Sequence, residues 1–393
     1  MRVAYVIPSL QKPGGWRSHA CAFISAIRQH VEPVLFVAAA DLEAARLLFP
    51  GQKIFSLPVT QQASFATRSG LRGLAACFRT ISQAAYPVVD LVHSLEAYPT
   101  GLAGAWLANR LGRPHVLTTH GTYGVIWYER KLDRVAYEYT LRKTRLICPV
   151  SHGTARLMQR YFTKALSGAC IHPILNGNDY HKTISRQEAL SRPAPDRPTL
   201  LTVGDVKPRK GQHASLAAFA IVKDQLPEAR YWIAGRFKPE QAYMQQIQQQ
   251  VAAQKIQEVT FLGDVSEAEL RRCYREASLF VLTPQPEGLH FEGFGLVYLE
   301  AGAYGLPVVG TRSGGIPDAV KDGETGFLAE PGDIDGIAEA ILRLLTDGDL
   351  ARRMGRANRQ WAETLTWERT AQEQYQAYQA LLAGDDSRPH PLP

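Results

Sequence analysis

Two carboxylates in the segment EGFGLVYLEAGAYGLPVV, Glu292 and Glu300, are separated by seven residues, and two glycines follow the first closely. Gly293 and Gly295 suit a tight loop whose backbone approaches a ligand. A helix beginning at Leu296 would direct free N–H groups and a partial positive charge at a phosphate. Glu292 would then lie near the group that the phosphate carries, and Glu300 could accept the two hydroxyls of a ribose. The spacing fits a ligand built of sugar, diphosphate and ribose; the alternative is an ordinary amphipathic helix with exposed acids.

Two cations, Arg209 and Lys210, occur in the segment VGDVKPRKG, residues 203–211, which follows a predicted strand. Cations there could balance a diphosphate and stabilise the charge on a departing phosphate. A solvated basic turn would have the same composition. The segment lacks the spacing of a Walker A loop, which argues against an ATPase.

In the N-terminal half, Gly14 and Gly15 follow the first predicted strand. Their backbone N–H groups could approach a phosphate or a sugar, and a plain turn is the alternative. The pattern is not G-x-G-x-x-G and so gives no support to a nicotinamide-binding site. His120, in LTTHGTYG, also follows a predicted strand. It could hydrogen-bond a sugar hydroxyl or a phosphate, or be an ordinary structural histidine.

The elements that must position these residues alternate along the whole chain. Short apolar runs such as VAYVIPSL, TLLTVGDV and SLFVLTP are separated by helix-like segments. This alternation predicts an α/β protein with two doubly wound, mostly parallel sheets, in which ligands bind beyond the carboxyl ends of the strands. We expect an N-terminal domain, a polar linker, a C-terminal domain, a closing helix and a disordered tail, at residues 1–180, 181–198, 199–365, 366–385 and 386–393.

Together these segments resemble glycosyltransferase family 4, a retaining family with the GT-B fold, in which two Rossmann-like domains face each other across a cleft. The strongest match is residues 292–333, with GLPVV, GGIP and DGETGFL after the two glutamates. Further matches are VGDVKPRKG, NGND at 176–179, FLGDVSEAEL and the helix that opens at Trp367. By this resemblance the closing helix packs back on the N-terminal domain.

The resemblance implies transfer of a sugar from a nucleotide-diphosphate sugar to an acceptor hydroxyl. Glu300 would hold the ribose, Glu292 would contact the transferred sugar, and Lys210 would neutralise the leaving diphosphate. The implied catalytic residues are Glu292, Lys210 and His120. The implied donor-binding residues are Gly14, Gly15, Arg209, Lys210, Leu262, Val265, Glu292, Gly293, Phe294, Gly295, Leu296 and Glu300.

The resemblance also implies that no metal ion and no other cofactor is needed. The acceptor hydroxyl would attack on the face from which the phosphate departs, and that phosphate would take the proton. A covalent role for Glu292 would need a paired acid about 5–5.5 Å away, and the sequence suggests none. One residue departs from the family pattern: Asp205 stands where the family often has arginine. An acid beside a diphosphate is unfavourable, so either Arg209 supplies the missing cation or the diphosphate is held differently.

Charge is unevenly distributed along the chain, which has a formal net charge of +7. Residues 1–180 contain 20 Lys and Arg against 9 Asp and Glu, and the remainder 24 against 28. An excess of +11 in the first part indicates an anionic partner or a solvated basic surface. Residues 68–83 read as a basic amphipathic helix with Arg68, Arg72 and Arg79 on one face and Leu71, Leu74, Phe78 and Ile81 on another. With Tyr123, these arginines are candidates for contact with the acceptor or an anionic membrane.

Five scattered cysteines, the absence of a signal-peptide pattern and the absence of a long apolar run lead us to expect a cytoplasmic protein, peripheral to the inner face of the membrane. A glycan, a lipid-linked sugar or a lipopolysaccharide-type acceptor, within cell-envelope polysaccharide synthesis, would fit. The alternatives are a nucleotide-sugar epimerase of GT-B fold and a non-catalytic nucleotide-sugar-binding protein, which Asp205 alone favours. No nucleic-acid-binding motif is present, and we expect no nucleic-acid partner.

Overall fold

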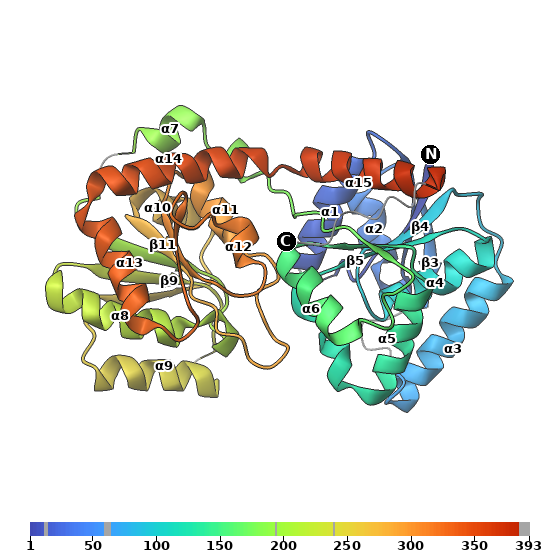
Figure 1. The fold of residues 1–393 in the computed structure, drawn as a ribbon, viewed down its shortest axis with the longest axis horizontal. Helices are drawn as coiled ribbons and strands as arrows, with labels where there is room; N and C mark the ends of the chain where they lie inside the picture. The colour runs from blue at the N-terminus through green and yellow to red at the C-terminus, as the bar shows by residue number, and fades with distance from the viewer. Residues whose placement is uncertain (12–14, 59–63, 193–194, 239, 385–393) are drawn as a thin grey trace. The chain divides into compact units, whose positions relative to one another are not determined.

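The computed structural model describes residues 1–11, 15–58, 64–192, 195–238 and 240–384. The chain divides into two compact units. Unit 1 contains Met1–Gly177 and the chain from Trp367 onward, and unit 2 contains Asn178–Thr366. Figure 1 shows the chain coloured from its N-terminus to its C-terminus, with the elements labelled.

The sheet of unit 1 has seven strands in the order β3-β2-β1-β4-β5-β6-β7, and all its neighbours pair in parallel. The order reverses between β1 and β4, so loops that leave these two strands diverge at the carboxyl edge and leave room for a ligand. The strands are β1 Arg2–Val6, β2 Glu32–Ala38, β3 Lys53–Leu57, β4 Leu91–Ser94, β5 His115–Thr119, β6 Leu146–Pro149 and β7 Cys170–Ile171.

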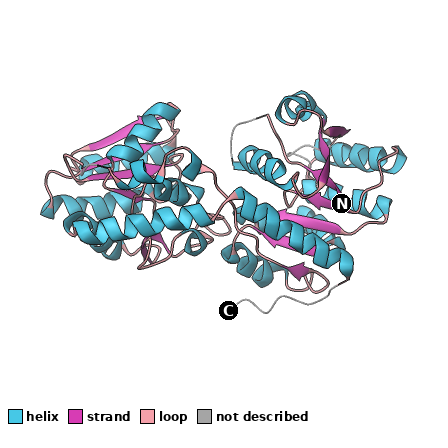
Figure 2. Ribbon diagram, turned by 90° about the horizontal axis from the view of Figure 1, so that it is seen from above, coloured by secondary structure: helices cyan, strands magenta, loops and turns pink. Residues whose placement is uncertain are grey.

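Helices cover both faces of this sheet (Figure 2). Alternate side chains of β1 enter two separate cores, because successive residues of a strand point to opposite faces. Val3 and Tyr5 pack with the core that contains α1 and α15, and Ala4 and Val6 pack with the core under α3 and α4. The helices are α1 Gly15–Ile27, α2 Leu42–Leu48, α3 Arg68–Gln83, α4 Thr100–Leu111, α5 Lys131–Lys143, α6 His152–Phe162 and α15 Trp367–Ala383, with the 3-10 helices η1 Ala39–Asp41, η2 Gly121–Gly124 and η3 Ile126–Glu129.

Unit 2 repeats this plan with a six-stranded parallel sheet in the order β10-β9-β8-β11-β12-β13. Here the order reverses between β8 and β11, which places the ligand-binding edge at the ends of those two strands. The strands are β8 Thr199–Val203, β9 Arg230–Ala234, β10 Val259–Gly263, β11 Leu279–Val281, β12 Val308–Thr311 and β13 Gly326–Ala329. The prediction of two doubly wound parallel sheets is therefore confirmed.

The core of unit 2 joins the central strands to the amphipathic helices α8 and α13 through residues such as Leu200, Phe219 and Ile341. The helix predicted to start at Leu296 does so, because Gly295 takes the left-handed conformation (φ +90°) that precedes it. The helices are α7 Arg186–Leu190, α8 Gln212–Gln225, α9 Ala242–Ala253, α10 Glu267–Glu276, α11 Leu296–Ala303, α12 Ile316–Ala319, α13 Ile334–Thr346 and α14 Gly348–Thr364, with the 3-10 helices η4 Tyr180–Lys182 and η5 Pro208–Lys210.

One chain segment differs from the expected division. Residues 181–198, expected as a linker, belong to unit 2 and contain α7, whose N-cap Ser185 accepts from the Glu188 N–H at 3.1 Å. Arg192 anchors this segment by donating to the carbonyl oxygen of Tyr274 at 2.6 Å. The final helix, α15, lies along α1 within unit 1, and its Tyr378 is fully buried there (Figure 1). The expected tail, 386–393, lies outside the described residues.

Candidate functional site

Two loops converge at the point in unit 2 where the strand order reverses. The loop after β8 ends at Gly211 (φ +72°), where an added Cβ would lie 1.8 Å from the Thr283 carbonyl oxygen. The Thr283 hydroxyl donates to the Gly211 carbonyl at 3.0 Å, and the Gln285 N–H donates to the Arg209 carbonyl at 3.1 Å. Glycine is therefore required at 211, since it lets the loop carrying the two cations lie directly against the segment that follows β11.

This convergence brings together three charged residues singled out in the sequence. The Lys210 Nζ lies 2.7 Å and the Arg209 guanidinium 3.0 Å from the same oxygen, Oε2 of Glu292. The side chains of Lys210 and Glu292 are only 12% and 14% exposed. Burial alone would raise the pKa of the Glu292 carboxyl, but Lys210 and Arg209 together lower it below its ordinary value. The cluster therefore holds one carboxylate and two cations, and has an excess positive charge.

The segment from Glu292 to Leu296 is held in place by the loop after β12. The Glu292 carbonyl accepts from the Gly315 N–H at 3.0 Å, and a Cβ at Gly314 would lie 2.3 Å from that carbonyl oxygen. Phe294 is buried, and Gly295 starts α11. The first turn of α11 thus begins within four residues of the carboxylate and offers backbone N–H groups to an anion.

Glu300 lies in a different environment from Glu292. It is on the second turn of α11, partly buried, and burial raises its pKa to about 7, with the hydroxyl of Tyr274 opposing the shift. Burial raises the pKa of Tyr180, and the charge of Glu300 adds to that shift. Glu292 and Glu300, although close in sequence, therefore lie in different chemical environments.

Asp205, which departs from the family pattern, has its own cations. Its carboxylate pairs with Lys207 at 2.8 Å and with Arg236 at 3.1 Å. Burial tends to raise the pKa of Asp205, but the hydrogen bonds from these cations bring it below its ordinary value. Arg236 follows β9, the neighbour of β8. This partner could not be predicted from the sequence, because the pairing depends on which strands are adjacent.

The two residues expected near the nucleotide base lie at the carboxyl end of β10. Leu262 is within the strand, and Val265 directly precedes Ser266, which caps α10. Both side chains are partly buried. Their strand is two positions from β8 in the sheet.

In unit 1, the carboxyl edge carries His120, which directly follows β5 as expected. Its Nε2–H donates to the Leu95 carbonyl at 3.1 Å. Burial lowers the pKa of His120 to about 4, so the ring is neutral at pH 7, and the buried ring of His19 packs against it with centroids 4.4 Å apart. Nδ1 of His120 is consequently the hydrogen-bond acceptor.

Gly15 and Tyr123 lie near the same edge, and Gly14 is outside the described residues. Gly15 opens α1, and a Cβ added there would meet nothing within 4 Å, so packing within the protein does not require glycine. Tyr123, in η2, packs against the ring of Trp16 with centroids 4.6 Å apart.

One residue of this edge, Glu96, was missed in the sequence. It follows β4, is 2% exposed, and one carboxyl oxygen accepts from the Ala97 N–H at 2.6 Å. The other oxygen, Oε2, is buried without a hydrogen-bond partner in the described structure. Burial raises the pKa of Glu96 to about 8, against the hydrogen bonds from Ala97 and Trp16. The sequence signal that could have identified Glu96 is an acidic residue two positions after a buried strand, at the point where the strand order reverses.

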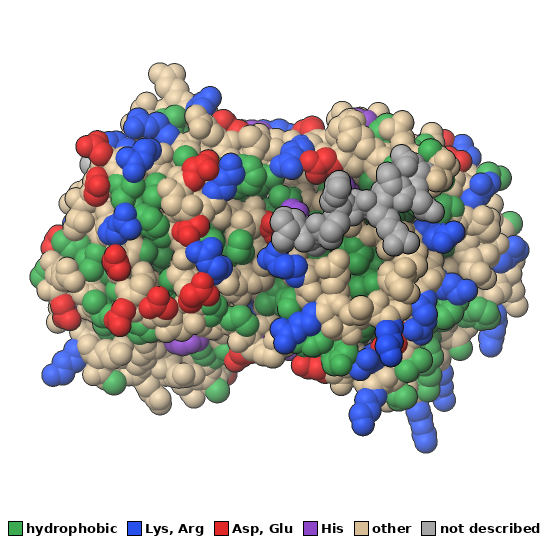
Figure 3. All heavy atoms as spheres, in the orientation of Figure 1, with side chains coloured by type: hydrophobic (Ala, Val, Ile, Leu, Met, Phe, Trp, Pro, Cys, Tyr) green, Lys and Arg blue, Asp and Glu red, His purple; other side chains and the backbone are tan. Residues whose placement is uncertain are grey.

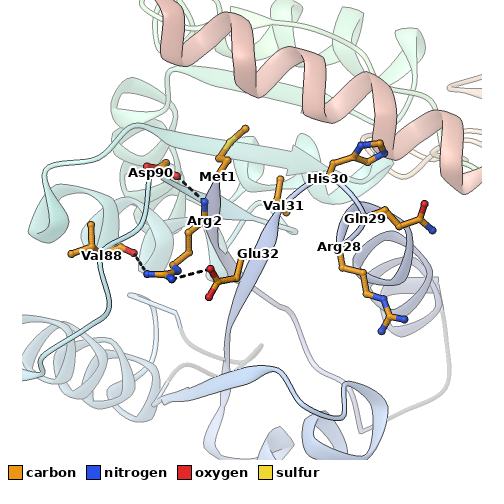
Figure 4. Close-up of a pocket in the computed structure, with 9 residues that line it drawn as sticks. All are labelled: Met1, Arg2, Arg28, Gln29, His30, Val31, Glu32, Val88 and Asp90. Carbon is orange, nitrogen blue, oxygen red and sulfur yellow. Dashed lines mark hydrogen bonds and ion pairs between the residues drawn. The ribbon is translucent and has the colours of Figure 1, made fainter.

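An open depression of about 510 Å³ in unit 1 is a poor alternative site (Figure 4). It lies at the amino ends of β1 and β2, the opposite edge from the residues above. Three of its charged side chains already have partners: the Arg2 guanidinium bonds Glu32 at 2.8 Å, and the Asp90 carboxylate accepts from the backbone N–H of Arg2 at 2.7 Å.

Family models match most of the chain. Residues 14–173 match the glycosyl transferase 4-like domain, and residues 184–361 match glycosyl transferases group 1. The chain is 32% identical, over 284 residues, to the GDP-mannose-dependent alpha-(1-6)-phosphatidylinositol monomannoside mannosyltransferase of Mycolicibacterium smegmatis, covering 70% of this chain and 72% of that protein.

Solved structures share the fold at lower identity. Sucrose-phosphate synthase from Thermosynechococcus elongatus superposes with a TM-score of 0.74 and 23% identity, covering 98% of this chain and 99% of that one. Anabaena HepE, in complex with UDP and glucose, superposes with a TM-score of 0.71 and 20% identity, covering 97% and 100%. The chain belongs to the GT4-type glycosyltransferases and has the GT-B fold.

Proposed function

We propose that unit 2 binds a nucleotide-diphosphate sugar through the cluster of Glu292, Lys210 and Arg209, and that the enzyme transfers the sugar to an acceptor hydroxyl with retention of anomeric configuration. The observation that carries the proposal is the convergence of two cations on one mostly buried carboxylate beside the start of α11. A diphosphate needs such an arrangement of cations and backbone N–H groups.

The cluster suggests an exchange of partners on binding. Without donor, Glu292 neutralises part of the charge on Lys210 and Arg209. An incoming diphosphate would take over these cations as the stronger anion. The Glu292 carboxylate would then be released to accept hydrogen bonds from the hydroxyls of the sugar. Glu300, one turn further along α11, would accept the hydroxyls of the ribose.

The transfer step needs no nucleophile from the enzyme in this proposal. The acceptor oxygen bonds to the anomeric carbon while the bond from that carbon to the phosphate oxygen breaks. The departing nucleoside diphosphate takes the acceptor proton, and Lys210 and Arg209 stabilise the charge that develops on it. We assign His120, neutral at pH 7, to a hydrogen bond with a substrate hydroxyl. The two cations provide the charge neutralisation that a divalent metal would otherwise supply.

The acceptor proposed is a hydroxyl of a glycan, a lipid-linked sugar or a lipopolysaccharide-type molecule, at the cytoplasmic face of a membrane. The mannosyltransferase relative is named for a phosphatidylinositol mannoside and for GDP-mannose, and HepE was solved with UDP-glucose. These names support a nucleotide-sugar donor and a saccharide or glycolipid acceptor. In the described part of the chain, no helix is long and apolar enough to cross a membrane.

The non-catalytic alternative loses its one supporting feature. Asp205 favoured it because an unpaired acid would repel a diphosphate, but Lys207 and Arg236 neutralise this acid. Arg209 stands beside Lys210 as the second cation of the cluster. With Asp205 in place of arginine, either Arg209 supplies the missing cation or the diphosphate is held differently. The position of Arg209 supports the first of these.

Calorimetric titration of the full chain with UDP, GDP, ADP and dTDP, with and without EDTA, tests the donor site. We expect one nucleotide to bind, EDTA to have no effect, and Lys210→Ala to weaken binding about 10- to 100-fold, as loss of a charge-assisted hydrogen bond does. Lys207→Ala is the matched control, since it removes the same charge from the same loop but from the partner of Asp205. Equal losses in both variants, or binding of no nucleotide, would contradict the assignment. NMR of the product's anomeric proton then tests retention.

A further inference from the structure

Exposed apolar side chains are concentrated on two helices of unit 1. Ten large hydrophobic side chains are exposed in the described chain, and four of them lie on α3 and α5. Leu71 and Phe78 on α3 are 44% and 54% exposed, and Leu132 and Val135 on α5 are 58% and 66% exposed. Such clustering, unlike single exposed residues, marks an interaction surface.

On α3 the four residues of the expected apolar face divide into two pairs. Leu74 and Ile81 are buried in the core, whereas Leu71 and Phe78 are exposed. At 100° per residue, these two lie on the boundary between the core stripe and the arginine stripe. They therefore stand in solvent beside Arg68, Arg72 and Arg79, which are all exposed.

A buried carboxylate ties the N-terminal ends of the two helices together. Asp133, in the first turn of α5, accepts from the Ser64 hydroxyl at 2.7 Å and the Phe65 N–H at 2.8 Å. Ser64 and Phe65 directly precede α3, whose N-cap Thr67 accepts from the Gly70 N–H at 3.1 Å. Both helices also contact α4, and they lie near each other in Figure 1. We call Arg68, Leu71, Arg72, Phe78, Arg79, Leu132 and Val135 the α3–α5 face.

The charge of this face is almost entirely positive. Helix α3 contains three arginines and no acid, and none of the three forms an ion pair within the described chain. On α5, Asp133 is buried and Glu138 is shared by Arg134 and Arg142. The exposed Glu129, just before α5, adjoins Arg130 and Lys131. Figure 3 shows Lys and Arg side chains projecting from the region of α3 and α5 at its lower right.

We propose that the α3–α5 face docks on an anionic lipid membrane. Apolar side chains flanked by cations on the outside of helices match an interfacial surface, in which the apolar groups enter the acyl boundary and the cations contact lipid phosphates. A nucleic acid would use the cations but leave Leu132 and Val135 in water. Self-association would bring the unpaired arginines of two copies together.

Co-sedimentation of the full chain with vesicles tests this surface. Neutral phosphatidylcholine vesicles are compared with vesicles that also contain phosphatidylglycerol, at low and high salt. We expect binding to the anionic vesicles only, decreasing as salt is added. Arg72→Ala/Arg79→Ala should weaken binding about 25-fold, roughly fivefold per cation. Arg352→Ala/Arg353→Ala, at two exposed positions of α14, is the matched charge control and should bind like the parent.

The apolar half of the face has its own variants. Phe78 also contacts the ring of Trp106 at 5.3 Å between centroids, so the cleaner substitution is Leu132→Ser/Val135→Ser on α5. We expect it to lower vesicle binding without lowering Tm, whereas Leu47→Ser, at a residue 78% exposed on α2, should change neither.

Three results would overturn the proposal. They are equal binding to neutral and anionic vesicles, binding that survives both the arginine and the α5 variants, and a parent dimer by light scattering that the α5 variants dissociate. The last would identify the face as a contact between copies. Vesicle binding requires no donor, so failure of this proposal and failure of the proposed transferase reaction are separable.

Discussion

Replacing Glu292 by glutamine should have opposite effects on nucleotide binding and on sugar transfer. In the donor-free protein the Glu292 carboxylate pairs with both Lys210 at 2.7 Å and Arg209 at 3.0 Å. A diphosphate that binds to these cations must displace it. Glu292→Gln removes this competitor while keeping the shape of the side chain.

The size of the effect follows from the burial of the cluster. A charged hydrogen bond contributes roughly 1.5–3 kcal/mol net, and the glutamine would keep a part of it by offering its carbonyl oxygen to one cation. We therefore expect a gain of about 1.4 kcal/mol, or a tenfold lower Kd for the nucleoside diphosphate. Transfer should fall about 100-fold or more, because the neutral amide cannot stabilise the positive charge that develops on the sugar in the transition state.

Calorimetry with the nucleoside diphosphate alone measures the first effect, and release of that diphosphate from the donor, in the presence of acceptor, measures the second. Asp205→Asn is the matched variant, because Asp205 is also a carboxylate held by two cations near the end of β8. We expect its Kd to change less than threefold. An unchanged or weaker affinity in Glu292→Gln, or the same gain in Asp205→Asn, would refute the displacement argument.

Three further substitutions test the scaffold. Gly211→Ala should lower the free energy of unfolding of unit 2 by several kcal/mol in urea, since its Cβ would collide with a backbone carbonyl. Gly51→Ala is the control: its φ (+79°) is similar but the space around it is open, so it should lower the free energy of unfolding by only about 1 kcal/mol. Glu96→Gln should gain stability relative to the parent protein as the pH rises from about 4.5 to 8. The folded parent keeps the Glu96 proton up to its raised pKa of about 8, whereas the unfolded chain loses it near pH 4.5, so rising pH favours unfolding of the parent only. A stability difference that does not change with pH would contradict this. Tyr378→Phe removes a buried hydrogen bond to His93 and should lower the stability of the protein by about 1–3 kcal/mol, measured by thermal melting. An unchanged Tm would contradict this.

Much of the geometry of the candidate site in unit 2 could be predicted because its signals are local. The turn at Gly295 and the apolar run after it fix the start of α11, and the reversal of strand order brings Arg209 and Lys210 to the segment that holds Glu292. The pairing of Arg209 with Glu292 follows once β8 and β11 are known to be neighbours.

Other features depend on distances that the sequence does not encode locally. The Asp205–Arg236 pair requires the register of β8 with β9, and the burial of Glu96 requires the packing around β4. The helical pattern put Leu71 and Phe78 on the apolar face, and they are nevertheless exposed because they lie at the edge of the core stripe, where a shift of one position along the helix separates burial from exposure. Boundary positions of this kind are decided by neighbouring elements.

The position of α15 affects the order in which the two units fold during synthesis. Unit 2 is continuous, so all of its residues have been made once Thr366 has been added. Unit 1 is begun first but lacks one helix until the end, and the core surface that Trp367 and Tyr378 cover stays open until then. Since domains fold as their chain emerges, the later unit would reach its final packing before the earlier one. Truncation before Trp367 would leave unit 1 permanently in that unfinished state.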